Sequence, residues 1–336
     1  MSALPPAVTG LLFLVSAAVT LLAARTFARR LDRQATRVGM PEALVGVLTA
    51  LAADSPEISS ALVALANGAH GVSVGVVVGS NVFNLAAMIG LSALLVGTVR
   101  LPRPALMLEG GIAVVALLAG AAVLLGWLPP VAAACVVLAF LVPYLSLLIG
   151  GRELLRRLPF PAGLSRRLGQ ALEERERAGG RARPSREPAW HDPLLFVADT
   201  VLIVLGSIGM VQAALALGHR WHVGGPVIGV LVLAPLTSVP NAVTGVRLGL
   251  SGRGPALVSE TFNSNTINLV AGIVLPALFV SAFGLSTAGR LDLLWLGGMT
   301  GLVLLLLSRS GGMGRVGAIA LVVAYVAFVS LQLVVR

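Results

Sequence analysis

The sequence contains no lysine, one cysteine and few charged residues, and each shortage narrows the class of protein. Only 11% of the 336 residues are charged, whereas a soluble domain carries about 25%. Hydrophobic residues make up 57% of the chain and fall into blocks of about 20, the length that crosses the hydrocarbon as a helix. These blocks do not alternate polar and apolar residues, which excludes a membrane β-barrel. The lone Cys135 excludes an intrachain disulfide.

The blocks predict an all-α membrane protein with ten transmembrane helices. A polar segment at 151–193, which holds ten of the 24 arginines, predicts a partly helical cytoplasmic linker. The linker would separate a first membrane region at 1–150 from a second at 194–336. The ten predicted spans are 8–24, 42–67, 72–97, 106–126, 130–149, 194–217, 225–246, 255–282, 292–308 and 316–335.

The arginines also predict the orientation of these spans. If the N-terminus lies outside, only Arg220, Arg290 and Arg336 fall in outside segments, and the other arginines fall inside. Both termini are therefore expected outside, in a bacterial-type plasma membrane. Although the net charge is +10, the arginines lie between apolar blocks rather than along one face. We therefore expect lipid bilayer and inorganic cations as partners and no nucleic acid.

The two halves repeat when the sequence is shifted by 184 residues. Polar matches carry the comparison because polar residues are rare inside the blocks. The matched pairs are Pro56 with Pro240, Gly68 with Gly252, Ser80 with Ser264, Asn81 with Asn265, and Asn84 with Asn268. The copies cover about 42–97 and 225–282 and begin five spans apart, which is an odd number. They are therefore predicted to be inverted five-helix repeats, an architecture typical of secondary transporters with a site near the membrane midplane.

The second span carries two acids in Asp54-Ser55-Pro56-Glu57. Acids three residues apart share a helix face, and each costs about 2.5–3.5 kcal/mol at the bilayer centre. A bound cation or a proton would offset that cost. Pro56 would free a backbone carbonyl one turn earlier, which completes an all-oxygen site suited to Ca²⁺ or Na⁺. The alternative is a proline kink with acids placed near the membrane interface.

The second repeat supplies neutral oxygens at the equivalent place, in Thr237-Ser238-Val239-Pro240-Asn241. The pairs Ser80/Asn84 and Ser264/Asn268 each lie four residues apart, so hydroxyl and amide share a face. Either pair alone is explained by hydrogen bonding between helices. Their occurrence at matched positions favours ion ligands. Asn81 and Asn265 point to another face and are interpreted as packing or kink-stabilising amides.

These motifs resemble the α-repeats of the calcium/cation antiporter superfamily, which includes the sodium/calcium exchangers. Gly79-Ser80-Asn81-Val82-Phe83-Asn84 is similar to the family's Gly-Ser-Asn-Ile-x-Asn or Asp, and Ala52–Glu57 aligns with its Gly-Thr-Ser-Leu-Pro-Glu. The resemblance implies alternating access, in which spans one and six slide past the site. It also implies that these residues face the ion: Glu57, Ser80, Asn84, Thr237, Ser238, Ser264 and Asn268.

The chain departs from the family pattern at three places. The family usually has one Glu in each repeat, but the second is Asn241 here, and Ala53 and Asp54 replace small hydroxyl residues. Asp54 and Asn241 therefore join the predicted ion-binding set, in which two carboxylates neutralise one Ca²⁺. Glu260, four residues before Ser264, is a candidate ligand on the access side of the site. Its alternative is a solvated acid in the first turn of a helix.

The leading hypothesis is an antiporter that exchanges Ca²⁺ for Na⁺ or H⁺ and needs no cofactor. Repulsion between Asp54 and Glu57 favours a shared proton, so H⁺-coupled exchange of another cation stays open. A third class is a non-transporting relative, such as a receptor or scaffold, and only the loss of symmetry at Asn241 favours it. An intramembrane protease is disfavoured because every histidine lies outside the apolar blocks. Glu109 and Asp199 are interpreted as interfacial anchors.

Overall fold

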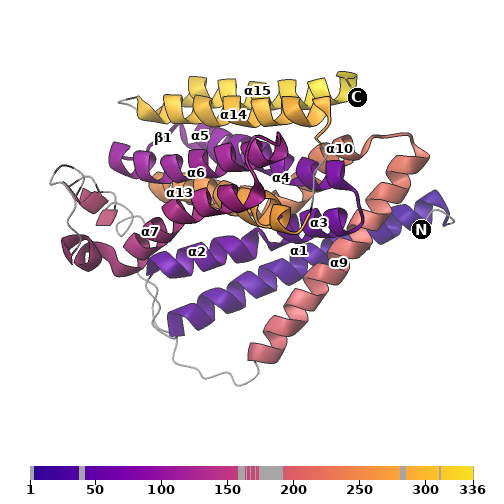
Figure 1. Ribbon diagram of the computed structural model, residues 1–336, viewed down its shortest axis with the longest axis horizontal. Helices are drawn as coiled ribbons and strands as arrows, with labels where there is room; N and C mark the ends of the chain where they lie inside the picture. The colour runs from indigo at the N-terminus through magenta and orange to yellow at the C-terminus, as the bar shows by residue number, and fades with distance from the viewer. Residues whose placement is uncertain are drawn as a thin grey trace.

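The computed structural model describes residues 4–37, 42–157, 163, 165–166, 168–170, 172–173, 192–280, 285–309 and 312–335, and nearly all of them are helical (Figure 1). Within these ranges the structure has one sheet, which consists of two antiparallel strands of two residues each. Long apolar helices therefore form the molecule, as the composition predicts. Most of the predicted linker, including residues 174–191, lies outside the described residues. The prediction that this part is partly helical therefore also falls outside them.

The first half of the chain begins with one long helix, α1, and continues with two helices that meet at Asp54. A π-helical turn, η1, then follows α4 without a gap. The elements are α1 (Pro6–Arg37), α2 (Glu42–Ala53), α3 (Ser55–Ala66), α4 (His70–Asn84), η1 (Leu85–Leu91), α5 (Ser92–Val96), β1 (Thr98–Val99), α6 (Arg103–Leu124) and α7 (Pro130–Arg157).

The second half follows a similar order. A helix that is broken at Ser238 precedes a helix that again passes into a π-helical turn. The elements are α9 (Asp192–Arg220), α10 (Gly225–Val227), η2 (Ile228–Leu233), α11 (Ala234–Thr237), α12 (Val239–Leu250), α13 (Gly254–Leu269), η3 (Val270–Val274), η4 (Pro276–Leu278), α14 (Thr287–Ser308), β2 (Met313–Gly314) and α15 (Arg315–Val335).

Seven of the described helices are long and apolar enough to cross a membrane, or nine if each of two bent pairs forms one span. The predicted span that is absent from this count, 255–282, contains α13 and η3. Its helix falls short because it carries many polar side chains, including Asn263, Ser264, Asn265 and Asn268. The chain is therefore a multi-pass membrane protein, and its ten spans stay a prediction.

The predicted ends of two spans differ from the structure. The span 8–24 is part of α1, which continues to Arg37, because its arginine-rich end is still a good helix former. The span 130–149 is part of α7, and Gly151 breaks that helix with φ 52° and ψ −144° before it resumes to Arg157. The composition marks where apolar residues stop, whereas a helix can continue into water.

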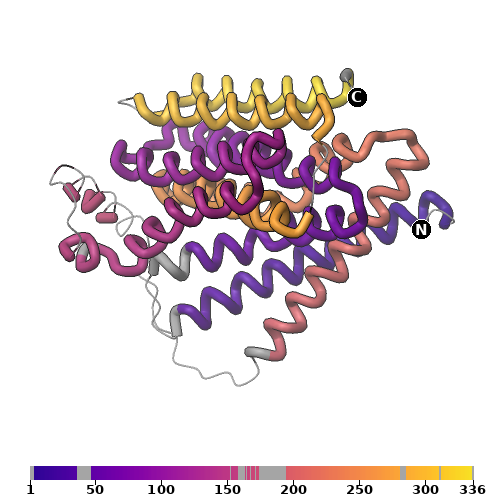
Figure 2. Tube along the Cα trace, in the orientation of Figure 1, coloured from indigo at the N-terminus to yellow at the C-terminus, as the bar shows by residue number. Residues whose placement is uncertain are grey.

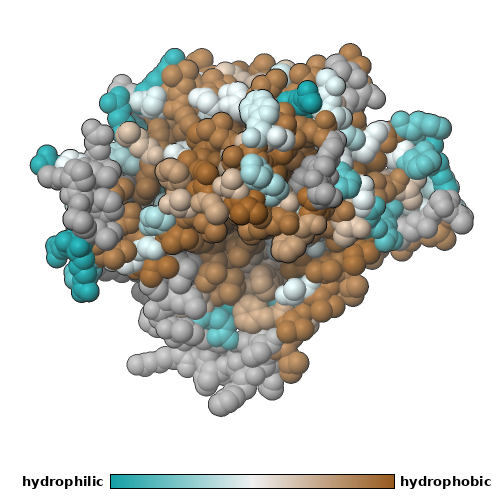
Figure 3. Space-filling view, in the orientation of Figure 1, coloured by the Kyte–Doolittle hydropathy of each residue, from teal (hydrophilic) through white to brown (hydrophobic). Residues whose placement is uncertain are grey.

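The helices are arranged so that the polar residues of both repeats lie inside. Helices α14 and α15 form one outer layer, and α1 and α9 lie together on another side of the core (Figures 1 and 2). Helices α4 and α13 lie in the centre, and almost every residue of α4 is buried. On the visible face, apolar residues cover the middle, and hydrophilic residues gather mainly toward the two ends of the long axis (Figure 3).

The backbone repeats at the same spacing of 184 residues as the sequence. Gly68 and Gly252 end their helices with φ +71° and +73°, a conformation that glycine adopts without strain.

Gly75 and Gly229 bring α4 against η2, since a Cβ on Gly229 would lie 2.5 Å from the Val72 carbonyl oxygen. Small residues at such contacts let membrane helices approach closely.

Candidate functional site

Two helix breaks place the candidate residues in the centre of the molecule. Helices α2 and α3 meet at an angle of 53°, and the α10–α11 segment meets α12 at 47°. The residues at the breaks, Asp54 and Ser238, are 184 positions apart and have nearly the same backbone angles, φ −81° and ψ −2° against φ −85° and ψ 0°. The two repeats therefore share the break as well as the sequence motif.

The prolines stabilise these breaks in a different way from the predicted kink. Pro56 and Pro240 are each the second residue of the following helix, where the missing N–H costs nothing. The carbonyl that Pro56 leaves free, that of Ala52, accepts a hydrogen bond from the Ser55 hydroxyl at 2.7 Å. This bond occupies one of the two lone pairs of the carbonyl oxygen, so its role as an ion ligand stays a prediction.

A hydrogen-bonded centre joins the acids of the first repeat to the second repeat. The Ser264 hydroxyl donates to Asp54 Oδ1 at 2.6 Å, and Asn241 Nδ2 donates to the same oxygen at 2.8 Å. Asn241 Nδ2 also lies 3.2 Å from Glu57 Oε1. One amide group therefore bridges the two carboxylates. All four side chains are at most 3% exposed, so the charges lie far from bulk water.

Helix α4 completes this centre with further amide and hydroxyl groups. Asn84 Nδ2 donates to Ser264 Oγ at 3.1 Å and to Asn265 Oδ1 at 3.3 Å. Among the described residues, several buried oxygen atoms accept or donate no hydrogen bond: Asp54 Oδ2, Glu57 Oε2, Ser80 Oγ, Asn84 Oδ1 and Asn268 Oδ1. Because an unpartnered buried oxygen is costly, this set fits a ligand that is bound through oxygen.

The remaining predicted residues are placed less uniformly. Thr237 is buried, and its hydroxyl donates to the Leu233 and Ala234 carbonyls at 2.9 and 3.2 Å, which leaves its oxygen lone pairs for a ligand. Ser238 is buried at the break itself. Glu260 is only half buried on α13, unlike Asp54 and Glu57. Its role on the access side of the site stays a prediction.

Asn81 and Asn265 have the packing role that the sequence predicts. Asn81 Nδ2 donates to the Asn265 carbonyl at 3.2 Å, and Asn265 Nδ2 donates to the Asn81 carbonyl at 3.1 Å. These reciprocal bonds join α4 to α13 at equivalent positions of the two repeats. They hold the two helices at a fixed register, and Asn265 additionally accepts from Asn84. The contact between Asn265 and the centre was not expected.

The charge of the centre is uncompensated within the described part of the chain. No described arginine forms an ion pair with Asp54 or Glu57. Among the described residues, no cluster of three or more His, Cys, Asp or Glu side chains could hold a metal ion. A cation here would thus be held by two carboxylates and neutral oxygens, the ligand set that hard cations prefer. Protons are the other means of neutralising two adjacent buried acids.

The sequence interpretation missed a second buried charge. Asp199 was interpreted as an interfacial anchor, but it is 5% exposed, and its carboxylate forms an ion pair with Arg30 at 2.8 Å and accepts from Thr26 at 2.8 Å. These bonds join α1 to α9. Glu109, also interpreted as an anchor, is 3% exposed. An acid inside an apolar block was the available signal, and it applied to Asp199 as it did to Glu57.

Solved structures show the same fold. The sodium–calcium exchanger NCX_Mj, soaked with Na⁺ and Sr²⁺, aligns over 97% of this chain and 99% of its own, with a TM-score of 0.61 and 16% identity. An H⁺/Ca²⁺ exchanger, CAX, aligns over 97% of this chain and 86% of its own, with a TM-score of 0.71 and 14% identity. At such identities the likeness concerns the fold alone.

Sequence relatives lie in the same group of ion exchangers. Human sodium/potassium/calcium exchanger 2 is 30% identical over 86 residues, which is 26% of this chain and 13% of the human protein. The chain thus matches about an eighth of that relative's length. A family model described as sodium/calcium exchanger protein matches residues 8–150 and 191–334. Family and fold neighbours are transporters rather than enzymes, and the chain belongs to the sodium/calcium exchanger protein family.

Proposed function

We propose that this protein is a secondary active cation antiporter that exchanges Ca²⁺ for Na⁺ or H⁺ by alternating access. The buried centre carries this proposal, because Asp54 and Glu57 are joined to the second repeat through Asn241 and Ser264. Two carboxylates balance one Ca²⁺, and the neutral oxygens around them complete its coordination. Because a sodium–calcium exchanger and an H⁺/Ca²⁺ exchanger both have this fold, the proposal keeps both coupling ions as choices.

The proposed architecture has ten spans in two inverted five-helix repeats, with the regions 1–150 and 194–336 on either side of a cytoplasmic linker at 151–193. Both termini lie outside in this arrangement. The matching breaks at Asp54 and Ser238 and the matching glycines support the repeat. An odd number of spans between the copies would invert one relative to the other, and in transporters with inverted repeats the site lies near the membrane midplane.

The proposed ion ligands come from both repeats: Asp54, Glu57, Ser80, Asn84, Thr237, Ser238, Asn241, Ser264 and Asn268. In the proposed cycle, α1 and α9 slide as a gate past this fixed centre. The ion pair between Arg30 and Asp199 and the hydrogen bond from Thr26 support movement of α1 and α9 as one body. A gate that moves in one piece can expose the centre to one side at a time.

A second candidate keeps the fold and exchanges H⁺ for another cation. The bridge favours it, because Asn241 Nδ2 lies 2.8 Å from Asp54 Oδ1 and 3.2 Å from Glu57 Oε1. Two acids that share one donor repel each other when both are charged, and one bound proton relieves the repulsion. Because Asn241 is neutral, a third possibility is that this protein has an altered site that no longer transports ions.

Uptake of ⁴⁵Ca²⁺ into proteoliposomes distinguishes these candidates. Purified protein is tested under a Na⁺ gradient, a pH gradient and no gradient, with Glu57→Gln as the matched inactive variant. Uptake that follows one gradient and disappears in the variant identifies the coupling ion. If folded protein gives no uptake under any gradient, the calcium proposal fails, and the same assay with other cations tests the second candidate.

The access-side role of Glu260 is tested in the same vesicles. Glu260→Gln removes the charge one turn before Ser264 and keeps the shape of the side chain. We expect the half-saturating Ca²⁺ concentration to rise by about threefold, because a charge that is still partly screened by solvent contributes on the order of 1 kcal/mol or less. Unchanged uptake and unchanged affinity would remove Glu260 from the site.

A further inference from the structure

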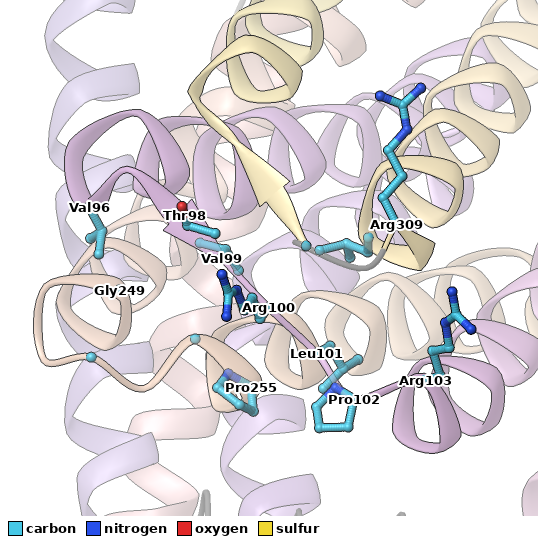
Figure 4. A pocket seen from close by; sticks show the side chains of 14 residues that line it. Val96, Thr98, Val99, Arg100, Leu101, Pro102, Arg103, Gly249, Pro255 and Arg309 are labelled. Atoms are coloured by element: carbon cyan, nitrogen blue, oxygen red, sulfur yellow. The ribbon is translucent and has the colours of Figure 1, made fainter.

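A second concentration of charge surrounds a pocket that none of the centre's residues lines. The pocket has a volume of about 670 Å³. Its walls are the segment 96–103 between α5 and α6, the turn between α12 and α13, and the end of α14 with Gly312. Figure 4 shows Arg100 on one side of this pocket and Arg103 and Arg309 on the other. Elements from both repeats thus meet around a pocket whose lining includes three arginines.

The lining carries charge of one sign only. Among the described residues that line the pocket, the charged ones are Arg100, Arg103 and Arg309, and no acid is present. Arg103 Nη2 donates to the Ser308 carbonyl at 3.3 Å, which holds this side chain at the end of α14. A guanidinium has five N–H donors, so Arg103 keeps others for a ligand. The lining therefore has a positive potential, which attracts anions.

Two helices begin at this pocket and add to its positive potential. Helix α6 starts at Arg103 and α13 at Gly254, and neither has a side-chain N-cap or an acid in its first turn. The first N–H groups of a helix lack partners within the helix, and the helix dipole favours an anion there. The N-termini of these helices add to the positive potential, but the inference rests on the three arginines.

The fold fixes the walls of the pocket in place. Strand β1 pairs with β2, with Thr98 opposite Gly314 and Val99 opposite Met313. Gly312 has φ +74°, and a Cβ there would lie 2.6 Å from the Val99 carbonyl oxygen, so a larger residue would not fit. The pairing holds Arg100 beside the connection between α14 and α15. The arrangement is therefore built by contacts between distant segments and not by one loose loop.

We propose that this pocket binds a phosphate-bearing anion. Arginines recognise phosphate oxygens through paired, charge-assisted hydrogen bonds, and the amides at the starts of α6 and α13 add neutral donors. The phosphate belongs to a phospholipid headgroup or to a soluble phosphate compound, which share this chemistry. An occupant would tie the first repeat, the second repeat and the α14–α15 pair together. The proposal does not depend on which cation the protein transports.

Binding to the full-length protein in neutral detergent tests the site. Native mass spectrometry measures retention of phosphatidylglycerol against phosphatidylcholine, and titration calorimetry measures binding of inorganic pyrophosphate. We expect Arg100→Gln and Arg309→Gln each to weaken binding by about tenfold, as for loss of one charge-assisted hydrogen bond. The control is Arg247→Gln, an exposed arginine of α12 outside the pocket, which should leave binding unchanged.

The two arms identify the source of the phosphate. Retention of phosphatidylglycerol alone indicates a lipid headgroup, and binding of pyrophosphate indicates a soluble ligand. The proposal is wrong if neither binds in preference to phosphatidylcholine, or if Arg247→Gln weakens binding as much as Arg309→Gln, which would indicate diffuse surface charge. Should a glutamine variant misfold, Arg309→Lys keeps the charge and should give an intermediate affinity.

Discussion

The helix break at Asp54 and the helix break at Ser238 have the same backbone and different charge. Both have a residue near φ −80° and ψ 0° followed by proline at the second position of the next helix. The first break carries Asp54 and Glu57, whereas the second carries Ser238 and Asn241 at the equivalent positions. The backbone of a repeat can therefore be kept while the charge of the site is gathered on one side.

The hydrogen bonds show what this unequal distribution achieves. Asn241 and Ser264 from the second repeat donate to the carboxylates of the first. The second repeat therefore supplies donors and neutral oxygens, and the first supplies the negative charge. Variants that move or remove one group test this division directly.

Loss of either carboxylate should have the largest effect. Glu57→Gln or Asp54→Asn removes half of the negative charge that balances Ca²⁺ and leaves the other buried groups poorly paired. We expect the apparent Ca²⁺ affinity in proteoliposome uptake to fall on the order of a hundredfold. Glu153→Gln, an exposed acid at the end of α7, is the matched control and should behave as the wild type. If all these variants took up Ca²⁺ as the wild type does, the buried acids would not form the transport site.

Moving an acid between the repeats sharpens the comparison. Asp54→Asn combined with Asn241→Asp exchanges amide and carboxylate across a hydrogen bond of 2.8 Å and keeps the total charge. We expect this double variant to recover about tenfold in Ca²⁺ affinity over Asp54→Asn alone, because coupled neighbours are not additive. Uptake by the two single variants and the double variant completes the cycle. No recovery would mean that the acid is needed on α2–α3 itself.

Removing the reciprocal amides should affect stability by a similar amount from either repeat. Asn81→Ala and Asn265→Ala each remove one of the two reciprocal bonds between α4 and α13 and leave a small cavity, at a cost of about 1–3 kcal/mol. The measurement is thermal unfolding of the purified protein in detergent. Asn265→Ala should lower the Ca²⁺ affinity more, because Asn265 also accepts from Asn84. A large stability difference between the two variants would argue against an equivalent role.

The smallest expected effects concern the matched glycines. Gly68→Ala and Gly252→Ala place a Cβ at φ +71° and +73°, where the left-handed conformation costs roughly 1–2 kcal/mol. Nothing lies within 4 Å of the added atom at either position, so strain is the whole effect. Thermal unfolding should show similar losses for both. Gly111→Ala in α6 is the control, since it has open space and a helical backbone and should be neutral or stabilising.

Much of this centre could be predicted from the sequence, because polar residues are rare inside the apolar blocks and therefore stand out. Asp54, Glu57, Asn241 and Ser264 were predicted together, and the structure brings them into hydrogen-bonding contact. Acids inside an apolar block indicated Asp54 and Glu57, whereas the repeat at 184 residues indicated Ser264 and the comparison with the family motif added Asn241.

Features that depend on tertiary contacts could not be predicted in this way. The break falls at Asp54 rather than at Pro56, because proline fits the first turn of a new helix. The π-helical turns after α4 and α13 have no sequence signal of their own. The ion pair of Arg30 with Asp199 needs α1 beside α9, which the order of spans alone does not give.

Equilibrium binding of ⁴⁵Ca²⁺ to the purified protein tests the central claim most directly, because it does not require a working transport cycle. The account predicts saturable binding that Na⁺ or H⁺ displaces and that the double variant Asp54→Asn, Glu57→Gln lacks, with Glu153→Gln binding as the wild type does. Undiminished binding in the double variant would contradict it, because the ion would then be held by groups other than the carboxylates at the first helix break.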